Sequence, residues 1–403
     1  MRTSAIAGIV AALIVILGII QIVRPVGRPT IAVSVPRTAR VSGPTPQLPW
    51  PNGVQAEVAV AGIGHSRQHG PAGPRPIGSM AKMMTAYLVL KAHPLGLYAN
   101  GPSLTATAQD AALYQEDANT SQSVYPVKAG ERLSERTLLE ALLVPSGNNI
   151  ATMLAQWVGG SVSRFTAAMN QAAHALGLTE THYHGPVGLN PQTDSTAADQ
   201  LRLAMILMKN PVFRNIVAMP QMPVLGESRV TYNYNSLLGH DHIIGVKTGS
   251  TTDSGGCVVL ARQLTLGSHT LTEYAAVVGQ PATRAEPSQL TASLLDAEAL
   301  VNSLGHDIQL RTAVPQGTTV ATLNVPWQHA VPLTTARAIK FMAWPGLRYT
   351  LHVVVHTPAT STIAANTVVG SLTARLGSQV VTVPIKTAAP IVAPSLAYRL
   401  LRG

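Results

Sequence analysis

The chain has 403 residues, of which 46% are hydrophobic and 11% charged, and its formal net charge is +10. This length allows two domains and a large core. The single cysteine, Cys257, excludes an internal disulfide and a structural zinc site built from cysteines. It falls in an apolar segment, so we interpret it as an inert buried residue.

The charge is unevenly distributed. Residues 1–52 carry five basic residues and residues 308–403 carry eight, and neither stretch has an acidic residue. Basic ends of this kind favour an anionic partner, which could be nucleic acid or an anionic surface of the cell envelope. The alternative interpretation is a solvated surface without a partner.

An apolar run over residues 5–23, without a charged residue, is the first element in chain order. As a helix it would be about 28 Å long, close to the thickness of the hydrocarbon core of a bilayer. It is longer than the core of a typical signal peptide. We therefore predict a membrane anchor, or alternatively a signal segment, at residues 1–23, which favours the envelope over nucleic acid. Most nearby arginines follow the run, and by the positive-inside tendency this opposes export.

Residues 24–52 contain seven prolines and are predicted as an extended linker without packed elements. Residues 55–63 predict a strand, and a loop over residues 65–76 leads into the run of residues 78–90. This run has few helix breakers and predicts a helix that opens at Ser79. Lys82 then lies one turn further on the same face, about 5–6 Å away between Cβ atoms.

A hydroxyl and an amine at this spacing can act as nucleophile and base. The helix is mostly apolar, so Lys82 is expected to be buried and shifted toward its neutral form, which can accept a proton. The motif Ser-x-x-Lys occurs by chance about once or twice in a chain of this length. The rest of the chain therefore has to supply the context.

Later segments complete the predicted architecture. Helices are predicted at residues 132–143, 149–157, 161–176, 196–208 and 288–304, and strands at residues 245–249, 256–262 and 271–279. We predict an α+β fold over residues 53–307, with an antiparallel sheet, helices against it and a helical cluster. From residue 308 to 403, short Val- and Thr-rich segments between Pro and Gly predict a small all-β, sandwich-like domain with a short basic tail.

Two further motifs lie downstream of Ser79. Ser146-Gly147-Asn148 interrupts two predicted helices, where side chains can point into a cleft. Lys247-Thr248-Gly249 lies on a predicted strand, and its glycine gives a ligand close access to the backbone. Three such motifs in this order, each in a fitting context, are hard to reach by accident.

With these motifs the chain resembles the penicillin-recognising serine D-alanyl-D-alanine carboxypeptidases, the low-molecular-mass penicillin-binding proteins of peptidase family S11. The resemblance covers about residues 52–305, and the β-rich end resembles the second domain of the family with lower specificity. The segments that carry it are residues 78–86 (GSMAKMMTA), 142–151 (LLVPSGNNIA), 188–189, 195–199 and 245–251 (GVKTGST) running into 255–257.

The resemblance implies roles for the first two motifs. Ser79 would be the nucleophile that attacks the carbonyl between two D-alanines and forms an acyl-enzyme. Lys82 would accept the Ser79 proton as general base. Ser146 would relay a proton to the leaving amine, and Asn148 would hold the substrate amide or Lys82.

The third motif would bind the substrate. Lys247 and Thr248 suit its terminal carboxylate, and repulsion between the like charges of Lys247 and Lys82 would help to keep one of the two lysines neutral. Gly249 would give backbone access. The backbone N–H groups of Ser79 and Ser250 would form the oxyanion hole. The resemblance implies no metal and no cofactor.

The expected partners are peptidoglycan pentapeptide stems, β-lactam antibiotics as acylating inhibitors, and a membrane surface or anionic wall polymer contacted by the basic ends. No nucleic acid is expected. The expected location is the cell envelope, outside the cytoplasm, with residues 5–23 as the anchor. A β-lactamase is disfavoured because Glu180 and Glu227 are followed four residues later by His184 and Thr231, where a deacylating Glu-x-x-x-Asn loop would need asparagine.

Two alternatives use the same residues differently. The first is a DD-endopeptidase that cuts cross-linked peptidoglycan, and the sequence does not separate it from a carboxypeptidase. The second is a catalytically idle scaffold that binds the wall.

Overall fold

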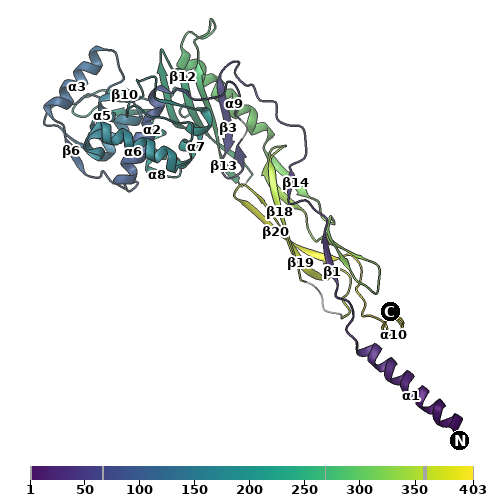
Figure 1. Ribbon diagram of the computed structural model, residues 1–403. Helices are drawn as coiled ribbons and strands as arrows, with labels where there is room; N and C mark the ends of the chain where they lie inside the picture. The colour runs from purple at the N-terminus through teal and green to yellow at the C-terminus, as the bar shows by residue number, and fades with distance from the viewer. Residues whose placement is uncertain (1, 66–67, 268, 357–360, 403) are drawn as a thin grey trace. The chain divides into compact units, whose positions relative to one another are not determined.

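The computed structural model describes residues 2–65, 68–267, 269–356 and 361–402. It forms two compact units, one of residues Met1–Thr45 with Ile308–Gly403, and one of residues Pro46–Asp307 (Figure 1). We name them the β unit and the α+β unit. The loop predicted over residues 65–76 lies partly outside the described residues, at 66 and 67.

The α+β unit is built on a five-stranded antiparallel sheet, which confirms the predicted fold class. The strand order is β11-β12-β13-β3-β4. All six residues of β3 are buried, and α9 (Gln289–Asp307) packs against β12 and β13. The strands are β3 (Gln55–Val60), β4 (Gly64–His65), β11 (Ile243–Thr251), β12 (Gly255–Leu266) and β13 (His269–Gln280).

A helical cluster packs around α2 (Lys82–Ala92), which lies against α4 (Glu135–Leu143), α5 (Asn148–Gly159), α6 (Val162–Ala175) and α7 (Ala197–Leu207). Met80, Met83 and Met84 are fully buried and fill this core. The cluster also includes α8 (Pro211–Val217). Each of these helices lies within a few residues of a predicted helix except α8, which was not predicted.

One further helix and several short strands were also not predicted. Helix α3 (Ala108–Asn119) begins with a capping box between Thr107 and Asp110. The predicted helix over residues 132–143 starts later, because residues 132–134 form strand β7. The remaining short strands pair as β6 (Ser103–Thr105) with β7 (Arg132–Ser134), β5 (Arg75–Pro76) with β8 (Asp194–Ser195), and β9 (Gln221–Pro223) with β10 (Val230–Tyr232).

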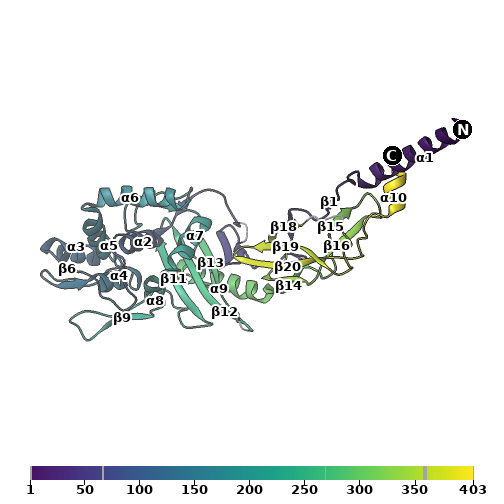
Figure 2. The same ribbon diagram turned by 90° about the horizontal axis from the view of Figure 1, so that it is seen from below.

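The β unit contains a seven-stranded sheet in the order β1-β15-β16-β20-β19-β18-β2 and a two-stranded sheet of β14 and β17. Figure 2 shows β16, β18, β19 and β20 side by side. The strands are β1 (Thr30–Val33), β2 (Thr38–Arg40), β14 (Gln309–Val314), β15 (Thr319–Asn324), β16 (Val331–Thr335), β17 (Ile339–Ala343), β18 (Arg348–Val355), β19 (Val368–Leu376) and β20 (Gln379–Thr387).

The prediction that residues 24–52 lack packed elements is wrong. Strand β1 pairs with β15 and strand β2 pairs with β18, so both edges of the large sheet come from this segment. Proline is excluded mainly from central strands, and the prolines of this segment lie between the two short edge strands and on either side of them.

Helix α1 (Arg2–Val23) covers the predicted anchor. Residues 6–23 are long and apolar enough to cross a membrane, by length and composition, and none of this window is buried. At its end, Gln21 donates to the Arg402 carbonyl at 2.5 Å, next to helix α10 (Leu396–Leu401).

Candidate active site

Ser79 lies on a tight turn in front of α2. Residues Gly78–Ala81 form the 3₁₀ helix η1, and Lys82 is the first residue of the α-helix proper. The prediction of an α-helix opening at Ser79 is therefore early by one turn. The predicted pairing is nevertheless present, because Lys82 Nζ donates to Ser79 Oγ at 2.8 Å.

Lys82 is fully buried among oxygen acceptors. Besides Ser79, its Nζ donates to Asn148 Oδ1 at 2.6 Å and to Ser146 Oγ at 3.2 Å. Ser146 stands in the break between α4 and α5 with a positive φ of 60°, and Asn148 opens α5. The helix break thus turns both side chains toward the amine, and for Asn148 this is one of the two contacts that the resemblance implies.

A loop that the sequence did not single out holds Asn148 in place. Asn148 Nδ2 donates to Gln122 Oε1 at 2.7 Å, and its backbone N–H donates to the Ser123 carbonyl at 2.8 Å. Because the amide nitrogen is occupied by Gln122, the amide oxygen faces Lys82. Gln122 lies 26 residues before Asn148, and no local pattern marks it.

Strand β11 brings the second lysine to the same place. Lys247 is 2% exposed, and its Nζ donates to Ser146 Oγ at 3.1 Å and to the Thr248 carbonyl at 2.9 Å. The Ser146 hydroxyl therefore lies between the two amines. Side chains from all three predicted motifs thus meet in one cluster, which consists of Ser79, Lys82, Ser146, Asn148 and Lys247.

Burial shifts the protonation of both amines. Desolvation holds the pKa of Lys82 well below its ordinary value, the nearby charge of Lys247 lowers it further, and Asp117 opposes the shift. Desolvation lowers the pKa of Lys247 to about 7. A lowered pKa favours the neutral amine, which is the form of a lysine that can accept a proton.

The backbone of β11 runs directly against η1. A Cβ atom at Gly249 would lie 3.0 Å from the Ser79 backbone nitrogen and 2.6 Å from the Ile77 carbonyl oxygen, so only glycine fits there. A Cβ atom at Gly78 would lie 3.2 Å from the Ser250 backbone nitrogen. The Ser79 and Ser250 residues predicted for the oxyanion hole thus lie on adjoining segments.

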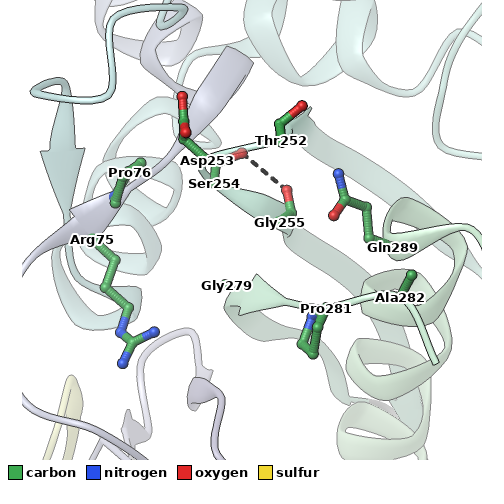
Figure 3. A pocket seen from close by; sticks show the side chains of 10 residues that line it. All are labelled: Arg75, Pro76, Thr252, Asp253, Ser254, Gly255, Gly279, Pro281, Ala282 and Gln289. Carbon is green, nitrogen blue, oxygen red and sulfur yellow. Dashed lines mark hydrogen bonds between the residues drawn. The ribbon is translucent and has the colours of Figure 1, made fainter.

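A cavity of about 270 Å³ opens beside the end of β11 (Figure 3). Gln289, which begins α9, donates from Nε2 to Ser250 Oγ and to the Thr251 carbonyl, both at 3.0 Å. Across the cavity in Figure 3 lies the Arg75 guanidinium. The cavity is lined by Arg75, Pro76, Thr252, Asp253, Ser254, Gly255, Gly279, Pro281, Ala282 and Gln289.

Cys257 takes no part in this cluster. It is fully buried on β12, and burial raises the pKa of its thiol to about 11. The predicted burial of this thiol is confirmed.

Solved structures with this fold are penicillin-binding proteins. Penicillin binding protein 5 from Haemophilus influenzae superposes with a TM-score of 0.60 over 87% of this chain and 100% of that chain, at 18% identity, and shows the fold alone. The Streptomyces K15 DD-transpeptidase superposes with a TM-score of 0.55 over 64% of this chain and 99% of that chain, at 28% identity. The fold is that of the penicillin-binding DD-peptidases.

Sequence comparison narrows this class to one family. The family model described as D-alanyl-D-alanine carboxypeptidase matches residues 68–266. A D-alanyl-D-alanine carboxypeptidase from Streptomyces sp. (strain K15) is 33% identical over 46% of this chain and 68% of its own length. The chain belongs to the D-alanyl-D-alanine carboxypeptidase family, peptidase family S11.

The relatives do not all bear the same name. A D-alanyl-D-alanine endopeptidase from Pseudomonas aeruginosa is 31% identical over 46% of this chain, and the match spans 58% of that protein. The carboxypeptidase DacD from Salmonella typhimurium is 31% identical over 49% of this chain, and the match spans 50% of that protein. The match thus covers little more than half of these two relatives.

Proposed function

We propose that this protein is a serine-type D-alanyl-D-alanine carboxypeptidase that removes the terminal D-alanine from peptidoglycan stem peptides through an acyl-enzyme. The observation that carries the proposal is the 2.8 Å contact between the Ser79 hydroxyl and a fully buried lysine with a lowered pKa. Family membership supports the same reaction and the same substrate class.

Acylation begins with Lys82 as the base. Its neutral amine takes the Ser79 proton while Oγ attacks the carbonyl carbon between the two D-alanines. The negative charge that develops on the carbonyl oxygen is stabilised by the backbone N–H groups of Ser79 and Ser250. The close packing of Gly249 against the Ser79 turn supports this role, because it brings the backbone next to Ser250 close to the backbone of Ser79.

For D-alanine to leave, its amine must receive a proton and its carboxylate must be bound. The C–N bond to D-alanine breaks while Lys82 returns the proton that it took from Ser79, through Ser146 Oγ, to the leaving amine, so that Lys82 is neutral again. Ser146 Oγ lies 3.2 Å from Lys82 Nζ and 3.1 Å from Lys247 Nζ. Lys247 and Thr248 bind the terminal carboxylate, whose charge favours the protonated amine of Lys247. Asn148 fixes Lys82 by accepting its hydrogen bond.

Hydrolysis completes the cycle. Water attacks the acyl carbonyl, Lys82 takes one water proton, and the C–O bond to Ser79 breaks with return of a proton to Oγ. A β-lactam acylates the same oxygen, so the protein binds penicillin covalently.

Mass spectrometry of the penicillin-treated protein tests this function. The wild type should gain the mass of one β-lactam on the peptide that contains Ser79. S79A should gain none, whereas the exposed-serine control S103A should label like the wild type. Absence of an adduct in the wild type would favour the idle scaffold and overturn the proposal.

An endopeptidase is the second candidate, because relatives from Pseudomonas aeruginosa and Escherichia coli carry that name. The wild type and S79A should be incubated separately with a linear pentapeptide muropeptide and with a cross-linked dimer. Loss of one D-alanine from the linear substrate, with the dimer intact, supports the carboxypeptidase. Cleavage of the cross-linked dimer alone would contradict the carboxypeptidase and favour the endopeptidase as the function of this protein.

We also place the protein in the cell envelope, outside the cytoplasm. Helix α1 as an anchor and the family's wall substrates support this location. The basic β unit would then contact an anionic membrane surface or wall polymer. A periplasm- or surface-dependent reporter fused after the last residue should be active, and activity of a cytoplasmic reporter at that position would contradict the location.

A further inference from the structure

Three arginines gather on one face of the seven-stranded sheet. Arg348 on β18 lies directly opposite Arg40 on β2 in the strand register. Thr350, two residues further along β18, lies opposite Arg375 on β19. Because residues two apart in a strand point to the same face, all three arginines share that face. We name Arg40, Arg348 and Arg375 the arginine cluster.

This face is the solvent side of the sheet. The three arginines are exposed, whereas Tyr349 on β18 and Ala374 on β19, which point to the other face, are buried. Arg40 donates to the Gly346 carbonyl at 2.9 Å, which leaves most of its donors available. Residues directly opposite on neighbouring strands have Cβ atoms about 5 Å apart, so the guanidinium groups of Arg40 and Arg348 repel each other.

The β unit has no negative side chain to offset this repulsion. Residues 1–45 and 308–403 hold 13 lysines and arginines and no aspartate or glutamate. Like charges that face each other across a sheet are destabilising, and a protein tolerates them at low cost when an outside anion neutralises them. The missing counter-charge is therefore expected to come from a ligand.

The arrangement of donors indicates phosphate. Guanidinium groups bind phosphate oxygens in a bidentate manner, and the threonine hydroxyls of the same face, such as Thr350, add neutral donors. Three arginines on three adjacent strands span about 10 Å, which is enough for more than one phosphate. An open sheet face also suits a chain that lies across it, whereas a single small anion would suit a pocket.

The position in the sheet favours a polymer over lipid headgroups. Strands β1 and β2 lie at opposite edges of the sheet, six strand spacings or about 29 Å apart. Helix α1, the proposed anchor, leads into β1, and the arginine cluster lies at the β2 edge. An anion bound at this edge therefore lies at the opposite side of the sheet from β1, the strand that follows the anchor. A polymer can reach that far, whereas lipid headgroups stay at the membrane.

We propose that the arginine cluster is a binding site for a phosphodiester polymer of the cell envelope. The site holds the enzyme on the wall independently of the acylation chemistry. The proposal rests on the envelope location given above and not on the identity of the peptidase reaction.

The test uses the full-length protein in detergent micelles and a soluble poly(glycerol phosphate) chain as the probe. The variant R40Q/R348Q/R375Q removes the cluster. The control R28Q/R337Q/K340Q removes the same charge from exposed positions of the β unit outside β2, β18 and β19. The dissociation constant is measured at several salt concentrations.

We expect the cluster variant to bind the polymer at least tenfold more weakly, with a shallower salt dependence because fewer counterions are released. The control should lose less than threefold. Equal losses in both variants would overturn the proposal, since net charge alone would then explain the binding. So would tighter binding to phosphatidylglycerol vesicles than to the polymer, or equal affinity for duplex DNA at matched phosphate.

Penicillin labelling separates this proposal from the proposed function. Both triple variants should form the penicillin adduct at the wild-type rate. A protein that binds the polymer but forms no adduct would keep the polymer site and overturn the peptidase. A protein that forms the adduct but does not bind the polymer would keep the peptidase and overturn the polymer site.

Discussion

The two units use positive charge in opposite ways. In the α+β unit, residues 46–307 carry 15 basic and 18 acidic residues, and the lysines of the site, Lys82 and Lys247, are buried. The β unit contains 13 basic residues and no acidic residue, and the arginines of the arginine cluster face solvent. Desolvation lowers the pKa of a buried lysine, so that its neutral amine can act as a base. Exposure to solvent keeps an arginine charged and able to attract anions.

Substitution of Lys82 tests the buried side of this comparison and has the largest expected effect. K82A removes the proposed base, so the rate of penicillin acylation should fall by about 10²–10⁴-fold, the usual contribution of a general base. The control K91A removes an exposed lysine from the same helix and should label normally. Rapid labelling of a folded K82A protein would show that another group takes the Ser79 proton.

The second prediction concerns a structural cation of the same unit. Arg262 donates to Glu273 at 2.5 Å, and their side chains are 11% and 0% exposed. R262M leaves a buried carboxylate without its partner, so the free energy of unfolding in urea should fall by about 3–5 kcal/mol. R229M breaks only the exposed pair with Glu227 and should leave the unfolding midpoint unchanged. Similar midpoints for both variants would mean that burial does not strengthen the Arg262 pair.

The third prediction follows from the pKa of Lys247, which burial lowers from 10.5 to about 7. Between these values the unfolded chain holds a proton that the folded chain has released. The free energy of unfolding should therefore rise with pH from about 7 to 10, by up to about 1.4 kcal/mol per pH unit, and the penalty is fully present below pH 7. The shift of Lys82 acts in the same direction.

Urea unfolding at several pH values measures this slope. K247M removes one of the two contributions and should flatten the curve, whereas K209M, at an exposed position, should keep the wild-type slope. Parallel curves for the wild type and K247M would show that Lys247 stays protonated in the folded protein.

The sequence predicts the α+β unit well because local signals coincide with the chemistry there. The break at Ser146-Gly147-Asn148, the strand around Lys247 and the turn spacing from Ser79 to Lys82 are each visible within a few residues. Their meeting point was inferred from the family resemblance, and the hydrogen bonds from Lys82 to Ser79, Ser146 and Asn148 match it.

Contacts that depend on distant pairing could not be predicted in this way. Strands β1 and β2 are four and three residues long, too short to show an alternating pattern, and their partners lie about 300 residues away. Gln122 and Gln289 support the site through side-chain hydrogen bonds. A lone glutamine in a loop or at a helix start gives no periodic or motif signal.

The smallest expected effect belongs to the exposed side of the comparison. R348T removes one member of the pair that faces Arg40 across the strands, and threonine has a high preference for strands. The variant should stabilise β18 and β2 slightly, by about 0.2–1 kcal/mol. Hydrogen exchange of peptides from these two strands, at low salt and without polymer, should slow accordingly, and added salt should reduce the difference by screening the repulsion.

R337T, at an exposed arginine outside both strands, should leave their exchange unchanged. Faster exchange in R348T would mean that the two arginines stabilise the sheet edge. Their repulsion would then no longer indicate an anionic ligand.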